Sequence, residues 1–416
     1  MCGYMNCEKG GTRMKVTFFS NFLNHHQLPF CLAMCKLTNN NFTFVATERI
    51  PQERLDMGYA DMNEAYPFVL RAYESEEAEH KAEKLALESD AIITGSAPEK
   101  YTVARVEQHK LTFRYSERVY KKGIWRALSP TGSRAMHKKH TIYRKEPLYM
   151  LCASAYTAMD FAIQGAYIDK TFKWGYFPEV KRYEVAELMK QKLSATSAGW
   201  KHPQASILWA GRLIGWKHPD ASIELAASLK EKGYSFKMSI IGNGEMEAQL
   251  REMIRANSLS DCVEMLGAMP PEEVRRHMEK ADIFLFTSDF NEGWGAVMNE
   301  SMNSGCAVVA SHAVGSVPFL VEDGVNGVIY KNGCQKDLNR AVMNLLDDPD
   351  KRRKIGQAAY ETMAKKWNGE TAAERFITLC EALNCGRNTP YQDGPCSKAE
   401  RIFQWNMYKC CKGIKR

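Results

Sequence analysis

The sequence lacks any long hydrophobic run. In its 416 residues no apolar stretch approaches the roughly 18 residues that a membrane-spanning helix requires. The first segment, MCGYMNCEKGGTR, also lacks the apolar core of a secretory signal. We therefore expect residues 1–13 to be a disordered leader and Met14 to be the functional start. With 45% hydrophobic and 25% charged residues, the chain has the composition of a globular protein, and its length allows two domains.

The cysteines lack the spacing of a metal site or of a disulfide framework. Thirteen are present, which is an odd number, and no C-x-x-C pair is matched by a second one. Several, such as Cys31, Cys152 and Cys306, lie in apolar segments, where free cysteine behaves as a small hydrophobe. The sequence therefore predicts reduced thiols, a cytoplasmic protein and no bound zinc.

Acidic residues are scarce in one segment of the first half. Residues 114–146 contain ten lysines or arginines and two acidic residues, a net charge of +8 against +7 for the whole chain. Such a segment is either a solvated face or a patch that meets anionic lipid or phosphate. The second interpretation implies peripheral contact with the inner face of a membrane, and the sequence leaves both open.

The glycine fingerprint of a dinucleotide-binding turn is incomplete. Gly242-Asn243-Gly244 follows a predicted strand, but Glu247 occupies the place of the third glycine. After the first predicted strand, KVTFFS, the segment NFLNHHQ contains no glycine. These two absences argue against an NAD-dependent dehydrogenase.

The chain does contain a regular alternation of short β-branched runs and longer helical patterns. In the first half we predict strands at 15–20, 42–47, 91–96 and 150–155, and helices at 28–37 and 75–89. In the second half we predict strands at 206–211, 236–242, 262–267, 282–288, 306–311 and 327–330, and helices at 245–256, 271–281, 337–348 and 350–366 and from Pro219 and about Trp294. This alternation predicts an α/β protein with two Rossmann-like, doubly wound parallel-sheet domains that face a cleft.

The predicted domain boundaries follow the breaks in this pattern. Residues 14–188 are the N-terminal domain, 189–205 a linker without a clear apolar strand, and 206–385 the C-terminal domain. Residues 386–416 are a tail whose last part, SKAERIFQWNMYKCCKGIKR, is typical of an amphipathic helix that packs back on the first domain or contacts a membrane. Because ligands of doubly wound sheets bind at the carboxyl ends of the strands, we expect the site in the cleft.

A nine-residue segment occurs twice, as GWKHPQASI from Gly199 and as GWKHPDASI from Gly215. The first copy precedes the strand at 206–211 and the second follows it, and a strand of this length spans roughly 17–20 Å. The two lysines therefore cannot share a site, and only Lys217 lies at the carboxyl end of the sheet. Together with Arg212 and the start of a helix, Lys217 forms a predicted anion site, in which Arg212 grips two phosphate oxygens and Lys217 adds a point charge.

The segment FTSDFNEGWGAVMNESMNSGCAVVAS carries two glutamates after a predicted buried strand. Glu292 lies in a loop and Glu300 on the next helix, and eight helical residues span about 12 Å. That exceeds the roughly 5–5.5 Å between the paired carboxylates of a retaining glycosidase. We therefore expect the two glutamates to hold opposite ends of one elongated ligand, a sugar and a ribose on either side of a diphosphate. Gly293 and Gly295 would let the backbone approach this ligand closely.

Five motifs occur in one order across roughly residues 206–375: G-R-L-x-x-x-K at 211–217, G-N-G-E at 242–245, E-G-W-G-A-V-M-N-E at 292–300, G-x-A-V-V-A-S at 305–311 and D-G-V-N-G at 323–327. In these motifs the chain resembles the retaining glycosyltransferases of family 4, and its two-domain layout resembles their GT-B fold. The resemblance implies an enzyme that moves a sugar, with retention, from a UDP- or GDP-sugar to a saccharide or lipid-linked acceptor. Such enzymes act in the synthesis of surface polysaccharide, lipopolysaccharide, capsule or glycolipid.

The resemblance also implies roles for single residues. Arg212 and Lys217 would bind the donor diphosphate, Glu292 would contact the sugar near the reacting carbon, and Glu300 would bind the ribose. Further contacts to the donor sugar and nucleotide are expected from Gly242, Asn243, Gly244, Gly293, Trp294 and Gly295. The family needs no metal or other cofactor, and the D-x-D pattern of Asp348-Pro349-Asp350 lies between two predicted helices, where it is typical of a turn. The expected partners are the donor and the acceptor, without nucleic acid.

The loop after the first strand departs from the family pattern. Family members commonly carry a glycine-rich loop there, whereas this chain has NFLNHHQLPF. His25 and His26 would lie at a helix start on the edge of the cleft, where either could contact the donor phosphate or the acceptor and act in catalysis. Since no other side chain in the motifs is an obvious nucleophile, we expect the leaving phosphate to take the acceptor proton.

Two alternatives remain open from the sequence. A nucleotide-sugar 2-epimerase has a similar two-domain fold and would act on the donor alone. A non-catalytic nucleotide-sugar-binding protein would bind the nucleotide without turnover.

Overall fold

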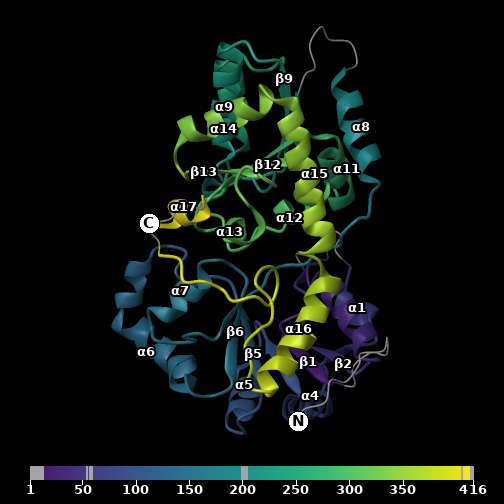
Figure 1. The fold of residues 1–416 in the computed structure, drawn as a ribbon, viewed down its shortest axis with the longest axis vertical. Coiled ribbons are helices and arrows are strands. Elements are labelled where there is room, and N and C mark those ends of the chain that lie inside the picture. The colour runs from purple at the N-terminus through teal and green to yellow at the C-terminus, as the bar shows by residue number, and fades with distance from the viewer. Residues whose placement is uncertain (1–13, 53–54, 56–59, 198–204, 404–405, 413–416) are drawn as a thin grey trace.

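Two parallel β-sheets form the framework of the protein, one above the other in the view of Figure 1. The structure is a computed structural model that describes residues 14–52, 55, 60–197, 205–403 and 406–412. The first sheet has the order β3-β2-β1-β4-β5-β6-β7, the second β10-β9-β8-β11-β12-β13, and the strands within each sheet are parallel. The predicted leader, and most of the first copy of the nine-residue repeat with Lys201, lie outside the described residues.

The strands of the first sheet are β1 (Val16–Ser20), β2 (Phe42–Ala46), β3 (Val69–Arg71), β4 (Ala91–Thr94), β5 (Thr112–Ser116), β6 (Leu148–Cys152) and β7 (Thr171–Lys173). Those of the second are β8 (Ala205–Ala210), β9 (Phe236–Ile241), β10 (Val263–Gly267), β11 (Ile283–Phe286), β12 (Ala307–Ser311) and β13 (Val328–Tyr330). Every residue of β1, β4, β11 and β12 is buried. This explains why these strands are continuous apolar runs, as expected for parallel strands covered on both faces.

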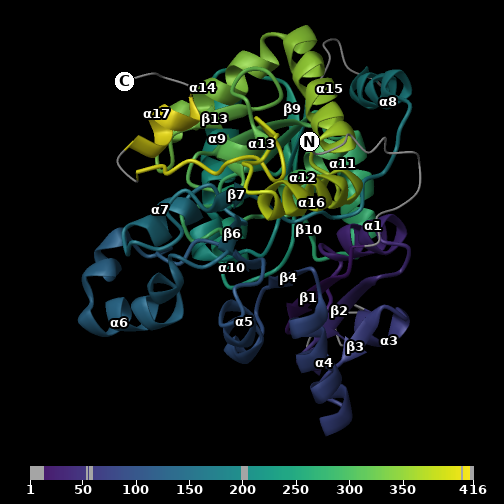
Figure 2. The ribbon, with the colours of Figure 1, turned by 60° about the horizontal axis from the view of Figure 1, so that its bottom comes forward.

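Helices cover the two sheets (Figures 1 and 2). In the first half they are α1 (Leu28–Leu37), α3 (Met62–Ala65), α4 (Glu76–Glu88), α5 (Glu99–Val106), α6 (Pro130–Lys139), α7 (Thr157–Ala162) and α8 (Val185–Ser197), with 3-10 turns η1 (Ile124–Leu128) and η2 (Thr141–Tyr143). In the second half they are α9 (Asp220–Glu231), α10 (Glu247–Ala256), α11 (Pro271–Lys280), α12 (Val297–Asn303), α13 (Val317–Leu320), α14 (Gln335–Leu346), α15 (Pro349–Lys365), α16 (Gly369–Asn384) and α17 (Met407–Cys411), with the 3-10 turn η3 (Gly215–Lys217). Across the described ranges, each helix is too short or too polar to cross a bilayer.

The strand order reverses at the first strand of each sheet. β1 lies between β2 and β4, and β8 lies between β9 and β11. Loops that follow such strands open onto the crevice where doubly wound sheets bind ligands. The loop with His25 and His26 follows β1, and the loop with Arg212 and Lys217 follows β8, so the topology puts these two loops at the expected places.

The structure differs from the sequence prediction at three short strands. β3, β5 and β7 were not predicted. β3 and β7 contain three residues each, too few to show a period. In β5, Arg114 interrupts the apolar pattern of the sequence. It can be buried in the strand because its guanidinium is neutralised by Glu99 at 2.6 Å.

A helix occupies most of the predicted linker at 189–205. α8 ends at Ser197, and its residues Leu188 and Met189 are buried beside Tyr360 and Ala364 of the second half. The ammonium group of Lys192 donates a hydrogen bond to the carbonyl oxygen of Met278 at 3.0 Å. This helix is held by contacts with distant residues, which explains why its own sequence did not predict a packed element.

The chain crosses back to the first sheet between α15 and α16. α15 packs beside α12, whereas α16 lies beside α1 in Figures 1 and 2. The ring of Phe376 in α16 lies 6.2 Å from the ring of Phe30 and 5.0 Å from that of Phe113. Part of the segment 206–385, predicted as one C-terminal domain, therefore packs on the N-terminal sheet.

The C-terminal tail also returns to the first sheet, but mostly not as the predicted amphipathic helix. Its backbone pairs with the edge strand β7, where the amide of Lys173 donates to the carbonyl of Ser397 at 2.7 Å and the amide of Ala399 to that of Thr171 at 3.0 Å. Only α17 is helical in the described part of the tail after residue 396. The unpaired edge of β7 offers backbone partners that a sequence pattern does not reveal.

Candidate active site

Lys217 and Glu292 form an ion pair at the carboxyl edge of the second sheet. The Nζ atom of Lys217 lies 2.5 Å from Oε2 of Glu292, and the two side chains are 13% and 11% exposed. The hydroxyl of Ser288 donates to the same oxygen at 3.1 Å. The loop is further fixed because the hydroxyl of Thr287 donates to the carbonyl of Lys217 at 2.7 Å. Both predicted residues thus meet, held by the ends of two neighbouring strands, β8 and β11.

Arg212 lies in the same loop, but its side chain is exposed. Among the described residues, neither an ion pair nor a side-chain hydrogen bond holds its guanidinium, so the group can turn toward an anion. The loop behind it is rigid, since the amide of Leu213 donates to the carbonyl of Asn243 at 2.8 Å and the amide of Met246 to that of Leu213 at 3.0 Å. The Asn243 side chain is exposed beside it.

The glycines of the G-N-G turn allow this close packing of two backbones. A Cβ atom on Gly242 would lie 1.8 Å from the carbonyl oxygen of Gly211, and the φ angle of Gly242 is 138°. A Cβ atom on Gly244 would lie 2.4 Å from the carbonyl oxygen of Leu213. The two glycines therefore shape the loop that carries Arg212, and their first role is structural.

The segment after Glu292 is a loop for longer than the sequence predicts. α12 begins at Val297 and not near Trp294, because Gly295 has a φ angle of 81°, which no residue within an α-helix adopts. The separation of about 12 Å inferred from a continuous helix between the two glutamates therefore does not apply. Glu300 does lie on α12, and burial raises the pKa of its carboxyl while the nearby Arg275 opposes this shift.

Trp294 is fully buried at the junction of the two sheets. Its indole Nε1 donates to Asn299 at 2.9 Å, and its ring lies 6.2 Å from that of Tyr176. A Cβ atom on Gly175 would lie 2.3 Å from the Trp294 ring. The indole therefore packs the two halves together, and it is not exposed for stacking on a sugar.

In the first half, His26 and Tyr176 lie next to each other, and Tyr176 also approaches Trp294. Their rings are stacked with centroids 5.3 Å apart and planes 3° apart, and the ring of His25 lies 3.7 Å from that of His26. The hydroxyl of Tyr176 donates to Oε1 of Glu117 at 2.6 Å. The predicted histidines thus lie at the start of α1, linked through one tyrosine to a carboxylate.

Glu117 meets the Glu292 loop directly and was not predicted. Its carboxyl carbon lies 2.1 Å from the position that a Cβ atom on Gly293 would occupy, and Lys121 binds its other oxygen at 2.7 Å. Glu117 is the first residue after β5, the position at a strand end where we expect ligand contacts. Glu117 could have been predicted as a site residue only together with the strand β5 that precedes it.

Arg118 and Asp160 form a second, buried ion pair beside this contact. Nη2 of Arg118 lies 3.2 Å from Oδ1 of Asp160, and both side chains are 1% exposed. Burial raises the pKa of Asp160, while Arg118 and two backbone amides oppose this shift. The guanidinium lies 5.9 Å from the ring centre of Phe290, which precedes Glu292 in the second half. This pair therefore lies where the first half approaches the loop that carries Glu292.

His218 and Asp289 connect the same two loops as Lys217 and Glu292. The Nε2 atom of His218 lies 3.6 Å from Oδ2 of Asp289. The hydrogen bond with Asp289 raises the pKa of His218, burial opposes this, and Asp220 adds to it. The backbone of His218 is left-handed, with φ at 48°. The second copy of the repeat therefore supplies a histidine as well as a lysine to this edge.

Metal ligands do not gather in the described part of the chain, where no group of three His, Cys, Asp or Glu side chains could hold an ion. The D-x-D pattern at 348–350 lies at the start of α15, where the carboxylate of Asp348 accepts a hydrogen bond from the amide of Lys351 at 2.9 Å. Asp348 therefore caps the helix α15, and it is distant in the sequence from the loops that carry Lys217 and Glu292.

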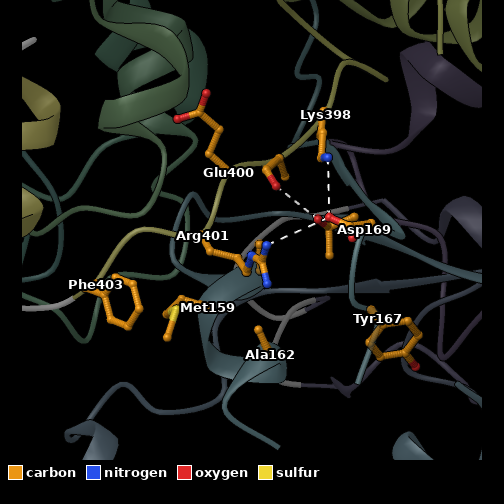
Figure 3. Close-up of a pocket in the computed structure, with 11 residues that line it drawn as sticks. Met159, Ala162, Tyr167, Asp169, Lys398, Glu400, Arg401 and Phe403 are labelled. Atoms are coloured by element: carbon orange, nitrogen blue, oxygen red, sulfur yellow. Dashed lines mark hydrogen bonds and ion pairs between the residues drawn. The ribbon is translucent and has the colours of Figure 1, made fainter. Parts of the chain in front are cut away.

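A separate cavity of about 560 Å³ lies between α7, β7 and the tail (Figure 3). Lys398 and Arg401 of the tail both approach Oδ1 of Asp169, at 3.4 and 3.8 Å. Met159, Ala162 and Phe403 supply apolar lining. None of the predicted site residues lines this cavity, so it is distinct from the cleft edge.

The fold is that of GT-B proteins. The structure of Anabaena HepE in complex with UDP superposes with a TM-score of 0.63 at 18% identity, covering 89% of this chain and 100% of that one. A structure of HepE in complex with UDP-glucose superposes with a TM-score of 0.57 over the same shares, also at 18% identity. At this identity the likeness establishes the arrangement of the two sheets.

Sequence comparison adds a match in the second half. Residues 191–362 match the family described as Glycosyl transferases group 1. The amylovoran biosynthesis glycosyltransferase AmsK of Erwinia amylovora is 32% identical over 187 residues, 44% of this chain and 46% of the relative. The alpha-D-kanosaminyltransferase of Streptomyces kanamyceticus is 30% identical over 173 residues, 42% and 44% respectively. The chain spans about half the length of the curated relatives it matches.

Proposed function

We propose that this protein is a retaining glycosyltransferase that moves a sugar from a UDP- or GDP-sugar to a saccharide or lipid-linked acceptor. The observation that carries the proposal is the Lys217–Glu292 ion pair, which lies at the carboxyl edge of the second sheet, in the segment that matches the group 1 family. AmsK, a relative over this half, is named for amylovoran biosynthesis, which supports a role in surface polysaccharide or glycolipid synthesis.

The donor diphosphate binds to Arg212 and Lys217 in this proposal. An ammonium group has three N–H donors, so Lys217 can keep its bond to Glu292 and still donate to phosphate oxygens. Arg212, exposed at the start of the same loop, adds a planar guanidinium that can donate two hydrogen bonds to one phosphate. Both charges are in place as the bond to the sugar breaks and negative charge grows on the diphosphate, which lowers the barrier.

Glu292 orients the sugar and stabilises the positive charge that develops at its reacting carbon. One of its oxygens already accepts from Lys217 and Ser288, which leaves the other for sugar hydroxyls. Glu300, on α12, binds the ribose of the donor. The backbone of Gly293 and Gly295 lies between these two carboxylates in the chain and borders the same ligand.

The acceptor binds against the wall formed by His25, His26, Tyr176 and Glu117. Retention requires attack on the face that the leaving group vacates, so the leaving phosphate takes the acceptor proton and no metal or other cofactor is needed. The described cysteines are all free, which supports a reducing, cytoplasmic location.

A thermal-shift panel with UDP, GDP, ADP and NAD tests the donor site. Ligand at about 100 times its Kd stabilises the fold by about 2.7 kcal/mol. We expect a shift with UDP or GDP that is lost in Arg212→Ala and Lys217→Ala and kept in Lys232→Ala, which removes an exposed lysine at the end of α9. A shift with NAD alone, or with no nucleotide, contradicts the proposal.

Transfer itself is tested by incubating the protein with UDP- or GDP-sugars and candidate saccharides and assigning the new anomeric bond by NMR. We expect the configuration of the donor to be kept. Conversion of the donor sugar without any acceptor would instead identify a 2-epimerase. Nucleotide binding without turnover on any acceptor would identify a non-catalytic binding protein.

A further inference from the structure

The outer end of the first half carries a surface that the donor site does not use. It is built from η1, α6, η2 and the end of α7, and α6 lies at the edge of the molecule in both Figure 1 and Figure 2. We call residues 122–145 together with Ile163 and Ile168 the α6 face.

One side chain, Gln164, joins the segments of the α6 face. Its amide nitrogen donates to the carbonyl of Ala127 at 2.8 Å, and its amide oxygen accepts from the hydroxyl of Ser133 at 3.0 Å. The hydroxyl of Thr141 donates to the backbone carbonyl of Gln164 at 2.8 Å. η1, α6 and η2 are therefore positioned as one unit on the end of α7, and they are not independent loops.

Large apolar side chains on the α6 face point into solvent. Trp125 is 67% exposed, Leu128 83% and Ile142 58%. Ile163 and Ile168 are also exposed, and Ala162, the neighbour of Ile163, lines the cavity of Figure 3. Elsewhere in the described ranges, the exposed large hydrophobic side chains are Leu32, Val119, Val325 and Phe403. Leu128 follows Ala127 and Ile142 follows Thr141, and both of these preceding residues bond to Gln164. Ile163 directly precedes Gln164. The three exposed side chains therefore lie on neighbouring segments of one surface.

The charge of the same face is of one sign. Residues 122–145 contain seven lysines or arginines and no acidic residue. Exposed basic residues of the face are Lys122, Arg126, Arg134, Lys138, Lys139, Arg144 and Lys145. Among these, Lys139 shares its charge with Glu99 at 2.7 Å.

We infer that the α6 face docks on the surface of an anionic lipid bilayer. Basic side chains near such a surface are attracted by its negative potential, and tryptophan is favoured at the boundary between headgroups and acyl chains. Trp125, Leu128 and Ile142 can enter this boundary while the surrounding lysines and arginines stay at the headgroups. A purely anionic polymer would use the charges but would leave these three side chains in water. The inference is independent of the donor chemistry proposed above.

Co-sedimentation of the full chain with vesicles tests this inference, without any nucleotide present. We expect binding to phosphatidylcholine vesicles that contain about 30% phosphatidylglycerol, no binding to phosphatidylcholine alone, and weakening at about 0.5 M salt. The variant Lys138→Gln/Arg144→Gln/Lys145→Gln should bind about 100-fold more weakly. The variant Trp125→Ser/Leu128→Ser should bind about 10-fold more weakly.

Matched controls remove the same kinds of side chain from the second half. Lys351→Gln/Arg353→Gln/Lys354→Gln and Val325→Ser change exposed residues away from the α6 face and should bind vesicles as the unaltered protein does. Unchanged thermal melts verify that all variants fold. Equal sedimentation with and without anionic vesicles overturns the inference. Loss of binding in the charge variant but full binding in Trp125→Ser/Leu128→Ser also overturns it, because the face would then recognise anionic charge of any kind.

Discussion

Lys217 is neutralised before any ligand arrives. With Glu292 at 2.5 Å and both side chains about nine-tenths buried, the ammonium group has one fixed position at the cleft edge. Burying a lone cation would be costly, whereas a paired one needs only its remaining N–H groups to be satisfied. In the proposed function, this pairing prepares the site, because the donor diphosphate would meet a lysine that is already oriented.

At the residue scale, Glu292→Gln separates the charge of this carboxylate from its shape. The amide can still accept a hydrogen bond from Ser288 and from Lys217. We expect nucleotide binding to be kept or strengthened, since Lys217 loses its competing anion, and kcat to fall about 100-fold because the positive charge on the sugar loses its partner. Parallel thermal shifts and turnover rates measure the two effects. Glu322→Gln, at an exposed glutamate, is the control, and a loss of binding equal to the loss of kcat would contradict this role.

His218 makes the same region sensitive to pH. Its pKa is raised, first by the hydrogen bond with Asp289, so its contribution to stability is complete below the unfolded pKa and is lost as the pH rises through the folded one. His218→Asn should therefore lower the Tm clearly at about pH 5.5 and much less at about pH 8.5. Melting curves across this range provide the measurement. His137→Asn, at an exposed histidine of α6, is the control. A difference in Tm between His218→Asn and the unaltered protein that stays constant with pH would argue against the Asp289 contact.

At the scale of elements, the loops after β8 and β9 act as one unit. Their backbones exchange hydrogen bonds at Leu213, Asn243 and Met246, and the contact leaves no room for a side chain at Gly242. The shape of the loop that carries Arg212 and Lys217 therefore depends on the loop after β9. A change in one of these loops should alter the backbone of the other.

Gly242→Ala tests this coupling. The new methyl group would meet the carbonyl oxygen of Gly211 and would require an unfavourable φ angle, so we expect a loss of about 3 kcal/mol in the free energy of unfolding. Gly233→Ala is the matched control, because its φ is also positive, at 76°, but no atom lies within 4 Å of the added methyl group. It should cost about 1 kcal/mol. Denaturant titration compares them, and equal losses would show that φ alone matters.

At the scale of the whole molecule, three connections join the two sheets. α8 leads from the first to the second, α16 returns to the first, and the tail pairs with β7 before α17 packs on the second half. In α17 the hydroxyl of Tyr408 donates to Asp337 at 2.9 Å, and Lys412 lies 2.8 Å from Asp323. Figure 1 shows this tail running across the boundary between the two halves. The tail thus connects the two halves across the junction at which the candidate site lies.

Ending the chain at residue 387 should remove this connection between the two halves. The amide of Lys173 would lose its acceptor on Ser397, and the edge of β7 would be open to solvent. We expect a lower Tm and faster amide hydrogen exchange in the peptide that contains β7. Exchange in β10, an edge strand of the other sheet, should not change. Tyr408→Phe, which removes only the bond to Asp337, gives a milder comparison, and unchanged exchange in β7 after truncation would contradict the pairing.

The alternation of strands and helices, the parallel sheets and the loops at their carboxyl ends could all be predicted from the sequence. These features depend on local periodicity and on neighbours in the chain, which is why strands such as β1 and β12 and the helix α1 were predicted within one residue at either end. The order of the motifs also indicated Arg212, Lys217, Glu292 and Glu300 as candidate site residues. Their roles in binding and transfer stay predictions.

The contacts between residues from distant parts of the chain could not be predicted and are visible only in the folded structure. The approach of Glu117 to Gly293, the ion pair of Lys217 with Glu292 and the burial of Trp294 between the halves depend on how the two sheets face each other. The return of α16 to α1 and the pairing of the tail with β7 likewise depend on surfaces that exist only after folding. A linear pattern records the period of each element, whereas such contacts are set by the packing of one element on another.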